Sequence, residues 1–362
     1  MTDFSEPPGA GAAPASRRPA AGAVGRSAAP RATLGSVAAL AGVSKQTVSN
    51  VINAPQMVRG NTASRVNAAI TQLGYRPHRA AAQLRTRRSR VLGLRIPNRY
   101  TDAVFDRFLH ALTDAAGALD YRIMLYTADD DTAEIRAYDE LLDGWDIDGF
   151  VLTGTHPGDE RTSYLSGAAV PCVTFGRPWD DSGHHPWVDV DGAAGTRAAT
   201  EHLISHGHRR IGFLGWPDSS GVGGDRLAGW AGAISAAGLP ALEPSRAVND
   251  AHQGRAAAAA LLDHTQPTAI VCASDVLALG AISEITARGM EVGRQIAVVG
   301  FDDTDISEVS GLSSLAQPLV EVALQSARLI AALLEKPADG PPEHVLLPPT
   351  LVTRASSAAF LP

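Results

Sequence analysis

A short stretch near the amino end of the chain groups polar side chains that could read the edges of DNA bases. Within residues 37–53, VAALAGVSKQTVSNVIN, Lys45 and Gln46 precede Asn50 by about one helical turn, and Thr47 and Ser49 lie between them. Lysine suits the acceptor groups of guanine, and an Asn or Gln amide suits the neighbouring donor and acceptor of adenine. Short hydroxyls suit phosphate oxygens, which position a protein without specifying a sequence. The residue types therefore predict major-groove recognition.

The charge distribution also favours a polyanionic partner. The formal net charge is −7, but residues 1–90 contain thirteen Lys and Arg residues and only two carboxylates, Asp3 and Glu6. Ten of the basic residues lie between Arg31 and Arg90, where there is no carboxylate. Because a solvated surface normally mixes both signs, we interpret this one-sided stretch as a DNA-facing surface.

A second set of polar residues follows the predicted strands of the rest of the chain. Ligands of open α/β sheets bind at the carboxyl ends of strands, and Arg, Asp, Ser and aromatic side chains suit sugar hydroxyls. Asp275, beside one of these residues, is assigned mainly to helix capping. Each of them could instead be structural, as a helix cap or a member of an ion pair. The candidate effector contacts are Phe105, Arg177, Arg226, Ser274, Phe301 and Asp302.

The sequence predicts no catalytic residues, no metal site and no cofactor. His202 and His206 have helical i, i+4 spacing, but a zinc protease motif needs its Glu between the histidines and Glu201 precedes both. Cys172 and Cys272 lie a hundred residues apart in apolar runs, which favours buried thiols over a disulfide or metal ligands. The chain has neither a G-x-S-x-G elbow nor a strand-linked G-x-G-x-x-G, and GVGGD lacks the lysine of a phosphate-binding loop.

Three short helices must position the amino-terminal polar residues. Thr33 can cap a helix that Gly42 ends, and Ser44 can cap the next one. A third apolar pattern runs from Val66 to Leu73. An alternative is a small helical bundle whose polar face only meets water. The preceding residues 1–31 are Ala, Pro, Gly, Ser and Arg with few large apolar side chains, and this composition predicts a disordered tail.

From Val91 onward, short apolar strands alternate with amphipathic helices, a pattern typical of βαβ units and parallel sheets. The number of strands exceeds what one small doubly wound sheet needs, so we expect two sheets, each with its own core. With no apolar run long enough to span a bilayer and no signal peptide, we expect a cytoplasmic location. The strand candidates are VLGLRI, YRIMLYT, DGFVLTG, PCVTFG, RRIGFLG, TAIVCAS and IAVVGFDD.

The amino-acid sequence of several segments resembles that of the LacI/GalR (lactose-repressor) family of bacterial transcription regulators. TLGSVAALAGVSKQTVSNVIN, from Thr33 to Asn53, matches the long T-x-x-x-V-A-x-x-A-G-V-S-x-x-T-V-S-x-V-x-N signature of that family. LGYRPHRAAAQLRTRRS is similar to the family's hinge. The segments RRIGFLGWP, DRLAGW, VVGFDD, LAQP and LVTRASS are similar to parts of its effector domain, so the resemblance covers nearly the whole chain after residue 31.

The resemblance implies a small all-α helix-turn-helix domain and an α/β core of two doubly wound parallel-sheet subdomains, similar to periplasmic sugar-binding proteins. It further implies a homodimer, with a tetramer left open, on a near-palindromic double-stranded DNA operator, and a small-molecule effector, a sugar first and a purine next. Arg226, Ser274 and Asp302 match effector-contacting positions, while Ala81 and Leu84 match hinge residues that enter the minor groove. The expected DNA-binding set is Thr33, Ser44, Lys45, Gln46, Thr47, Ser49, Asn50, Asn53, Ala81 and Leu84.

The expected domain boundaries follow from this resemblance and from the sequence patterns described above. We expect a helix-turn-helix domain over residues 32–76, a hinge helix and linker over 77–89, and an effector-binding and dimerisation core over 90–362. Within the core, the N-subdomain is expected at about 90–187 and 316–345, and the C-subdomain at about 188–315 and 346–362.

Two positions depart from the family pattern. Ala63 follows Thr62 where the family commonly has Arg, and His78 stands where the family has Asn after the hinge proline, so some backbone contacts are expected to differ. Leu84 has an alternative role in packing against its own helical domain. The competing function is a small-molecule receptor of the solute-binding type with no DNA partner, whose core would look the same. The basic amino end argues against it.

Overall fold

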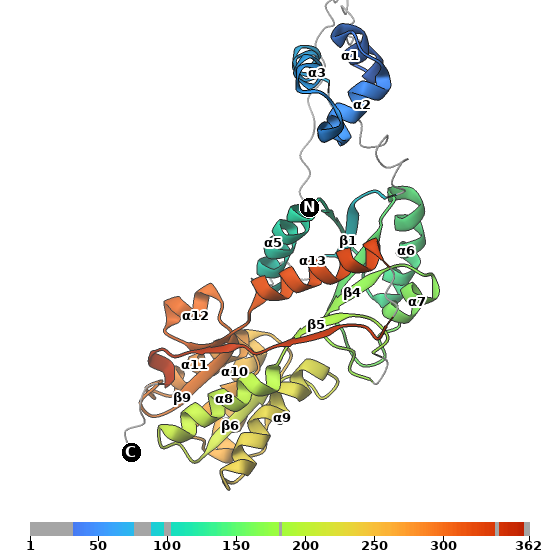
Figure 1. Ribbon diagram of the computed structural model, residues 1–362. Helices are drawn as coiled ribbons and strands as arrows, with labels where there is room; N and C mark the ends of the chain where they lie inside the picture. Colours follow the sequence, from blue (N-terminus) through green and yellow to red (C-terminus); the bar gives the residue numbers. More distant parts are fainter. Residues whose placement is uncertain (1–31, 76–87, 98–102, 181–182, 337–339, 358–362) are drawn as a thin grey trace, which may run out of the picture. The chain divides into compact units, whose positions relative to one another are not determined.

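The computed structural model divides the chain into two compact units, residues 1–86 and 87–362, which are described separately. The predicted tail over residues 1–31 and the hinge residues Ala81 and Leu84 lie outside the described residues. The structure describes residues 32–75, 88–97, 103–180, 183–336 and 340–357 (Figure 1).

The amino-terminal unit contains the predicted helices, α1 (Leu34–Ala41), α2 (Lys45–Asn53) and α3 (Gly60–Leu73), with a short 3-10 turn η1 (Pro55–Met57) after α2. Thr33 caps α1 through a capping box with Ser36, and Gly42 ends it at a φ of 63°. Ser44 caps α2 by accepting a hydrogen bond from the Thr47 amide. One small core joins the three helices and consists of Val37, Ala38, Ala41, Val48, Val51, Val66, Ala69 and Tyr75.

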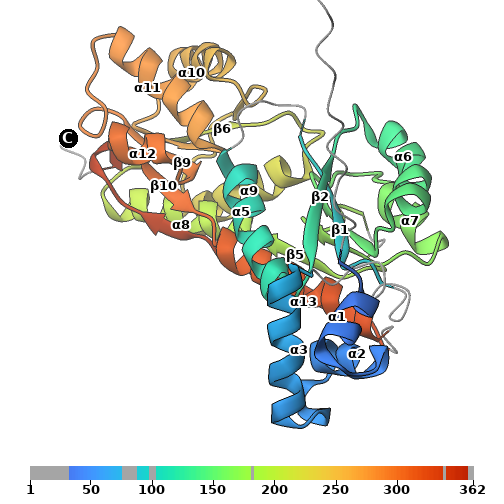
Figure 2. The same cartoon turned by 90° about the horizontal axis from the view of Figure 1, so that it is seen from above.

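The second unit begins with a six-stranded sheet of order β11-β5-β4-β3-β1-β2, in which every pairing is parallel. Helices α5 (Ala103–Ala118) and α13 (Leu319–Glu335) cover one face, and α6 (Asp131–Trp145) and α7 (Arg161–Gly167) cover the other (Figures 1 and 2). The strands are β1 (Val91–Arg95), β2 (Arg122–Tyr126), β3 (Gly149–Thr153), β4 (Cys172–Phe175), β5 (Trp187–Val190) and β11 (His344–Leu347).

A second six-stranded sheet has the order β12-β10-β9-β8-β6-β7, and only β12 runs antiparallel to its neighbour. Helix α8 (Gly192–Ser205) packs with α9 (Gly221–Ala236), and α10 (Ala251–Thr265) packs with α11 (Asp275–Ala287). Two short helices, α12 (Asp305–Ser310) and η2 (Ala355–Ser357), complete this half. The strands are β6 (Ile211–Gly215), β7 (Ser245–Arg246), β8 (Ala269–Cys272), β9 (Ala297–Asp302), β10 (Ser313–Ala316) and β12 (Thr350–Val352).

The chain passes between the two sheets three times, from β5 to α8, from β10 to α13 and from β11 to β12. The predicted fold class, a helix-turn-helix domain with two parallel-sheet subdomains, is confirmed. The subdomain boundaries after residues 187 and 345 fall inside β5 and β11. In the structure the first subdomain extends to the ends of these strands, three residues later at Val190 and two residues later at Leu347. Both strands pair with each other along their length within the first sheet.

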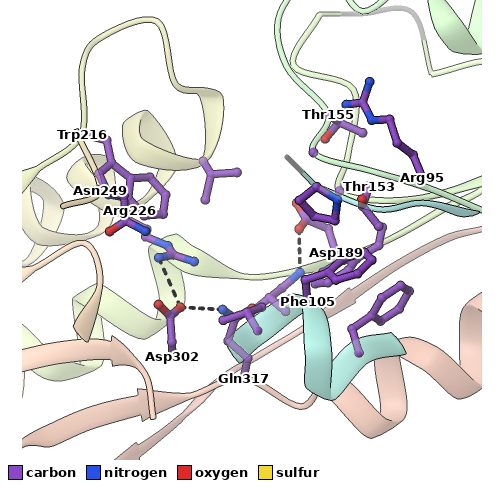
Figure 3. A pocket seen from close by; sticks show the side chains of 18 residues that line it. Arg95, Phe105, Thr153, Thr155, Asp189, Trp216, Arg226, Asn249, Asp302 and Gln317 are labelled. Atoms are coloured by element: carbon purple, nitrogen blue, oxygen red, sulfur yellow. Dashed lines mark hydrogen bonds and ion pairs between the residues drawn. The ribbon is translucent and has the colours of Figure 1, made fainter. Parts of the chain in front are cut away.

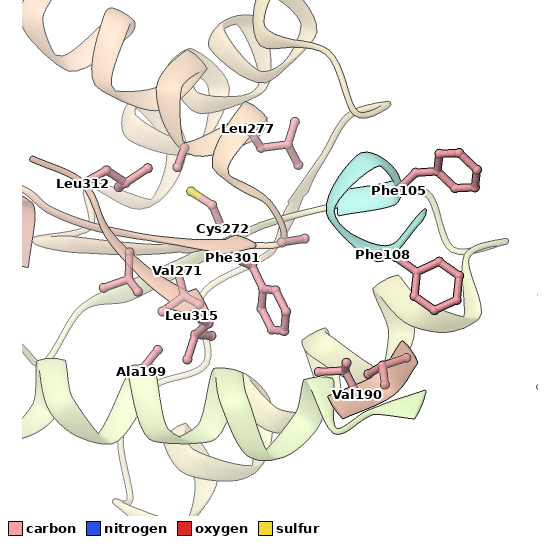
Figure 4. Packing of buried hydrophobic residues seen from close by; sticks show 14 of the residues in the cluster. Phe105, Phe108, Val190, Ala199, Val271, Cys272, Leu277, Phe301, Leu312 and Leu315 are labelled. Carbon is pink, nitrogen blue, oxygen red and sulfur yellow. The ribbon is translucent and has the colours of Figure 1, made fainter. Parts of the chain in front are cut away.

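Buried hydrophobic side chains from both subdomains form one continuous cluster. Phe108 of α5, Val190 of β5 and Phe301 of β9 belong to it (Figure 4). Cys172 and Cys272 are buried free thiols, as predicted, and burial raises the pKa of Cys172 to about 12. Among the residues that the structure describes, no helix has the length and apolar character needed to cross a membrane.

Candidate DNA-contacting face and ligand cleft

The outer face of α2 carries the predicted base-reading residues. Val48 and Val51 are buried on the inner face, whereas Lys45 and Gln46 are exposed. The Gln46 amide Nε2 donates to the Asn50 carbonyl oxygen Oδ1 at 2.9 Å, so these two side chains form one paired unit. The structure therefore brings together three of the residues that could read bases.

The other predicted DNA-binding residues of this unit divide into two groups, and of these Thr47 and Ser49 are the predicted phosphate contacts. The hydroxyls of Ser44 and Thr47 lie 2.9 Å apart and take part in the cap of α2, and Thr33 takes part in the cap of α1. Ser49 is half-buried on α2, and Asn53 is its last residue. Helix capping and phosphate contact are compatible, because phosphates bind at helix amino ends. The DNA roles of all these residues stay predictions.

A cavity of about 340 Å³ lies between the two sheets of the second unit, at the carboxyl ends of their strands (Figure 3). This volume falls in the range of small-molecule sites. The first subdomain contributes Arg95, Phe105, Thr153, Thr155 and Asp189, and the second contributes Trp216, Arg226, Asn249, Asp302 and Gln317.

Arg226 is the central polar group of the cavity wall. Its guanidinium carbon lies 3.5 Å from the centre of the Phe301 ring and 4.9 Å from that of Trp216, so the group is held between two aromatic faces. Nη1 donates to the Ala273 carbonyl oxygen and lies 3.7 Å from Asp302 Oδ1. Burial lowers the pKa of Arg226. Within the described residues, Nε of Arg226 and Nε1 of Trp216 are buried donors without a hydrogen-bond partner, and a ligand oxygen can supply one.

Asp302 occupies a strained turn at the end of β9. Its φ is 110° and that of Asp303 is 47°, a region that non-glycine residues rarely adopt. Gln317 Nε2 donates to Asp302 Oδ1 at 2.7 Å and fixes the carboxylate at the cavity wall. Backbone strain of this kind clusters at ligand sites, because the surrounding contacts must hold the turn in place.

Three of the six predicted effector residues, Phe105, Arg226 and Asp302, line the cavity. The other three stand behind the wall and support residues that line it. Arg177 Nε donates to Asp189 Oδ2 at 2.6 Å, Ser274 Oγ donates to Asn249 Oδ1 at 2.6 Å, and Phe301 packs on Arg226. The effector-binding role of all six stays a prediction.

The expectation that Asp275 caps a helix is wrong. Ser274 is the cap of α11, because its Oγ accepts a hydrogen bond from the Leu277 amide at 3.2 Å. The Asp275 carboxylate is buried and accepts hydrogen bonds from Thr304, Ser307 and Ser314. It ties α11 to α12 and β10, and burial raises its pKa.

Several residues that line the cavity were missed by sequence reasoning. Trp216 directly follows β6, so the rule that ligands bind at strand ends could have found it. Asp189 lies in β5, a strand that was not predicted from WVDV. Asn249 and Gln317 follow short strands, β7 and β10, that were also not predicted.

One cluster has the composition of a metal site but is an ion-pair network. The possible ligand atoms of Asp131, His156 and Asp159 lie within 4.8 Å of one another. The buried guanidinium of Arg161 already supplies positive charge, with Nη2 2.7 Å from Asp159 Oδ2 and Nε 3.5 Å from Asp131 Oδ1. Glu134, also fully buried, pairs with both Arg161 and Arg95.

Comparisons with known proteins match both units. Residues 33–78 match the family model "Bacterial regulatory proteins, lacI family", and residues 200–357 match a periplasmic binding protein-like domain. The HTH-type transcriptional regulator CelR of Thermobifida fusca is 34% identical over 310 residues, which cover 83% of this chain and 91% of CelR.

Solved structures of two regulators have similar folds. The chain resembles a transcriptional regulator CelR–cellobiose complex with a TM-score of 0.69 and 31% identity, over 90% of this chain and all of the other. It resembles the Lac repressor dimer bound to operator and the anti-inducer ONPF with a TM-score of 0.79 and 28% identity, over 91% of this chain and all of that one.

Proposed function

Because this chain belongs to the lacI family of bacterial regulatory proteins, we propose that it is a ligand-responsive transcriptional regulator that binds a specific DNA operator, as a repressor. The family resemblance drawn from the sequence is confirmed by 34% identity over 83% of the chain. The observation that carries the proposal is the combination of a carboxylate-free helix-turn-helix with a cavity between two sheets.

In the proposed DNA complex, α2 enters the major groove and presents Lys45, Gln46 and Asn50 to base edges. Thr33, Ser44, Thr47, Ser49 and Asn53 contact the backbone. Ala81 and Leu84 enter the minor groove, where an apolar wedge kinks the duplex. Two such units on a near-palindromic operator require a homodimer, because the symmetry of the site mirrors that of the protein.

The proposed effector is an uncharged molecule with several hydroxyls, that is, a sugar. The charges of the wall are already compensated, since Arg226 faces Asp302 and Arg95 Nη1 lies 2.6 Å from Glu134 Oε2. Hydroxyls donate and accept, so they match a wall that offers the buried donors Arg226 Nε and Trp216 Nε1 beside a carboxylate. A complex of the relative CelR contains cellobiose, which supports this class of ligand. A purine is the second choice.

We propose that DNA binding is controlled by a movement of the two subdomains relative to each other, with the three chain segments that connect the sheets acting as the hinge. An effector that contacts both walls changes the balance between two subdomain arrangements by its difference in affinity for them. One contact between the subdomains joins the cavity to α5, since Arg107 Nη1 donates to the Asp303 carbonyl oxygen at 2.8 Å, next to Asp302. Operator affinity then depends on effector through linkage.

We assign the dimer contact in the second unit to α12. Ile306 is 58% exposed and Val309 is 90% exposed, so this short helix presents two apolar side chains to solvent. Because residues three apart lie on the same face of a helix, the two side chains form one exposed apolar patch, and such patches mark protein–protein interaction sites. Sedimentation should show that Val309→Asp shifts the dimer toward monomer, whereas the control Glu308→Asp should leave it intact.

We also propose that the regulator acts in the cytoplasm, where its DNA partner is, and that it has no catalytic activity, in keeping with relatives named as transcriptional regulators.

A gel-shift experiment with a pool of randomised duplexes at low salt tests the proposal. The full chain should retain and enrich a duplex, while a chain that begins at Val91 should retain none. If the full chain binds no duplex, the function as a DNA-binding regulator is wrong and the solute-binding receptor becomes the better account.

A thermal-shift screen of sugars, including cellobiose, and of nucleobases tests the proposal that the effector is a sugar. A ligand at a hundred times its dissociation constant stabilises the folded protein by about 2.7 kcal/mol. Stabilisation by nucleobases alone would contradict the sugar assignment.

A further inference from the structure

Arg65 of α3 makes the main side-chain contact to the turn between α1 and α2. The last carbonyl groups of a helix lack partners within the helix and carry a partial negative charge. At the end of α1, the backbone amides of Gly42 and Val43 bond to Ala39 and Ala38. The carbonyl oxygens of Ala41 and Gly42, at the end of this turn, accept hydrogen bonds from Arg65 Nη2, the second at 3.2 Å.

This contact holds the backbone turn that immediately precedes α2. Gly42 adopts a left-handed φ of 63°, and Ser44, two residues later, is the cap of α2. A Cβ atom at Gly42 would lie 3.2 Å from Arg65 Nη2, so the guanidinium sits directly on the turn. Val66, the next residue of α3, is fully buried in the core of the unit. Arg65 thus contacts the turn, while Val66 packs in the core that α3 shares with α1 and α2.

The sequence alone gives Arg65 a different role. Between residues 32 and 75 there are three cations, Lys45, Arg59 and Arg65, and no carboxylate, so each cation is a candidate phosphate contact. The structure directs the Arg65 side chain to two backbone carbonyls of its own domain. With no acidic side chain available in this segment, the end of the α1 dipole is the negative group that Arg65 contacts.

We propose that Arg65 is a positioning residue for operator recognition, which sets the direction of α2 and contributes no phosphate contact. The proposal rests on the DNA-binding function proposed above. A phosphate contact and a positioning contact differ in their salt dependence. Each neutralised phosphate adds about 0.9 to the slope of log affinity against log salt, whereas a positioning residue changes affinity without changing that slope.

The test uses the full chain and the duplex that the wild-type protein enriches from a random pool, with a scrambled duplex of the same composition. Affinities for both are measured by fluorescence anisotropy from about 50 to about 200 mM KCl. The variant is Arg65→Met, which keeps an unbranched, flexible stem and removes the donors. The matched control is Arg59→Met, an exposed arginine just before α3.

We expect Arg65→Met to lose about tenfold or more in affinity for the enriched duplex, because base contacts made by α2 lose their alignment. Affinity for the scrambled duplex should change less than about twofold, and the salt slope should stay the same on both. General unfolding of the domain would instead lower binding to both duplexes.

Equal losses on both duplexes with a slope reduced by about 0.9 would assign Arg65 to a phosphate and overturn the proposal. No change in either affinity would overturn it as well. If circular dichroism shows that Arg65→Met unfolds the domain, Arg65→Lys decides the question. Lysine keeps the charge, but its side chain ends one bond short of the position from which Arg65 Nη2 contacts both carbonyl oxygens. A positioning role then predicts lower specificity, and a phosphate role predicts little change. A wild-type protein that enriches no duplex would contradict the proposed function itself, not this assignment.

Discussion

On the outer face of α2, two amide side chains act as one reading unit. Because Gln46 Nε2 donates to Asn50 Oδ1, each amide limits the rotation of the other before DNA arrives. A side chain that is already oriented loses less conformational entropy on binding, which favours selective contacts.

Asn50→Ala should relax the base preference at one or two positions of each operator half-site, by about 1–3 kcal/mol per base pair. Gln46→Ala should affect the same positions, and the double variant should lose less than the sum of the two, because the residues are in contact. Selection from a randomised operator, followed by sequencing, measures both effects. Asn67→Ala on the exposed side of α3 is the control, and an unchanged preference in Asn50→Ala would refute the reading role.

In the cavity, the double change Arg226→Met with Asp302→Asn should reduce the thermal shift given by the best sugar of the screen by about half or more. Removing both partners avoids leaving an unpaired buried charge, which would destabilise the protein by itself. Hydrogen bonds to charged groups contribute about 1.5–3 kcal/mol, so sugar affinity should fall by roughly 10- to 150-fold. Arg328→Gln, in an exposed pair with Glu343, is the control. A full thermal shift in the double variant would remove Arg226 and Asp302 from the site.

For the cavity, the sequence predicted which residues lie near the site more successfully than it predicted which partners their side chains contact. The position of Ser274 at a strand end is visible in the sequence, but its bond to Asn249, twenty-five residues earlier, depends on how two loops meet. Arg177 is equally visible, yet its side chain turns to Asp189 and Asp225 instead of lining the cavity. Direction of a side chain is a tertiary property, and a single sequence does not contain it.

Among the elements, the longer apolar runs were predicted as strands, whereas five strands of two to four residues, β5, β7, β10, β11 and β12, were not predicted. Each of the seven strand candidates contains a strand of the structure. In contrast, β10 has the sequence SSLA, and its two serines are fully buried. Their burial depends on partners far along the chain, since Ser314 bonds to Asp275 and the Ser313 amide to Ser356. Without those partners in view, the serines indicate a loop.

The hinge is the element whose prediction carries the most functional weight, although Leu84 lies outside the described residues. Leu84→Ala should weaken operator binding more than binding to a scrambled duplex, because only bent operator accommodates the apolar wedge. Anisotropy on both duplexes measures the difference, and Leu73→Ala at the end of α3 is the control. Equal losses on the two duplexes would instead favour packing of Leu84 against its own domain.

Across the whole molecule, two buried imidazoles should make the fold sensitive to acid. Burial lowers the pKa of His185, beside the first sheet, and of His208, beside the second, to about 4. In the unfolded chain both groups bind a proton below about pH 6.5, while in the folded chain they do so only near pH 4. Stability is therefore lost as the pH falls through this window, by up to about 1.4 kcal/mol per pH unit for each group.

Urea unfolding at pH 7, 6 and 5 should show the midpoint of the wild-type protein falling with pH. The double variant His185→Gln with His208→Gln should show a flatter dependence, because it has lost both proton-binding differences. Curves that remain parallel would show that other groups cause the acid sensitivity.

The three passages between the sheets have a consequence for synthesis on the ribosome. The helix-turn-helix unit is contiguous, and all of its residues emerge within the first quarter of translation. Neither half of the ligand cleft can close its sheet until β11 and β12 have emerged, because the first sheet ends with residues 344–347 and the second with residues 350–352. A nascent chain therefore completes its helix-turn-helix unit long before it completes its ligand cleft. Translation that stops early would leave the helix-turn-helix unit without the cleft that makes it respond to a ligand.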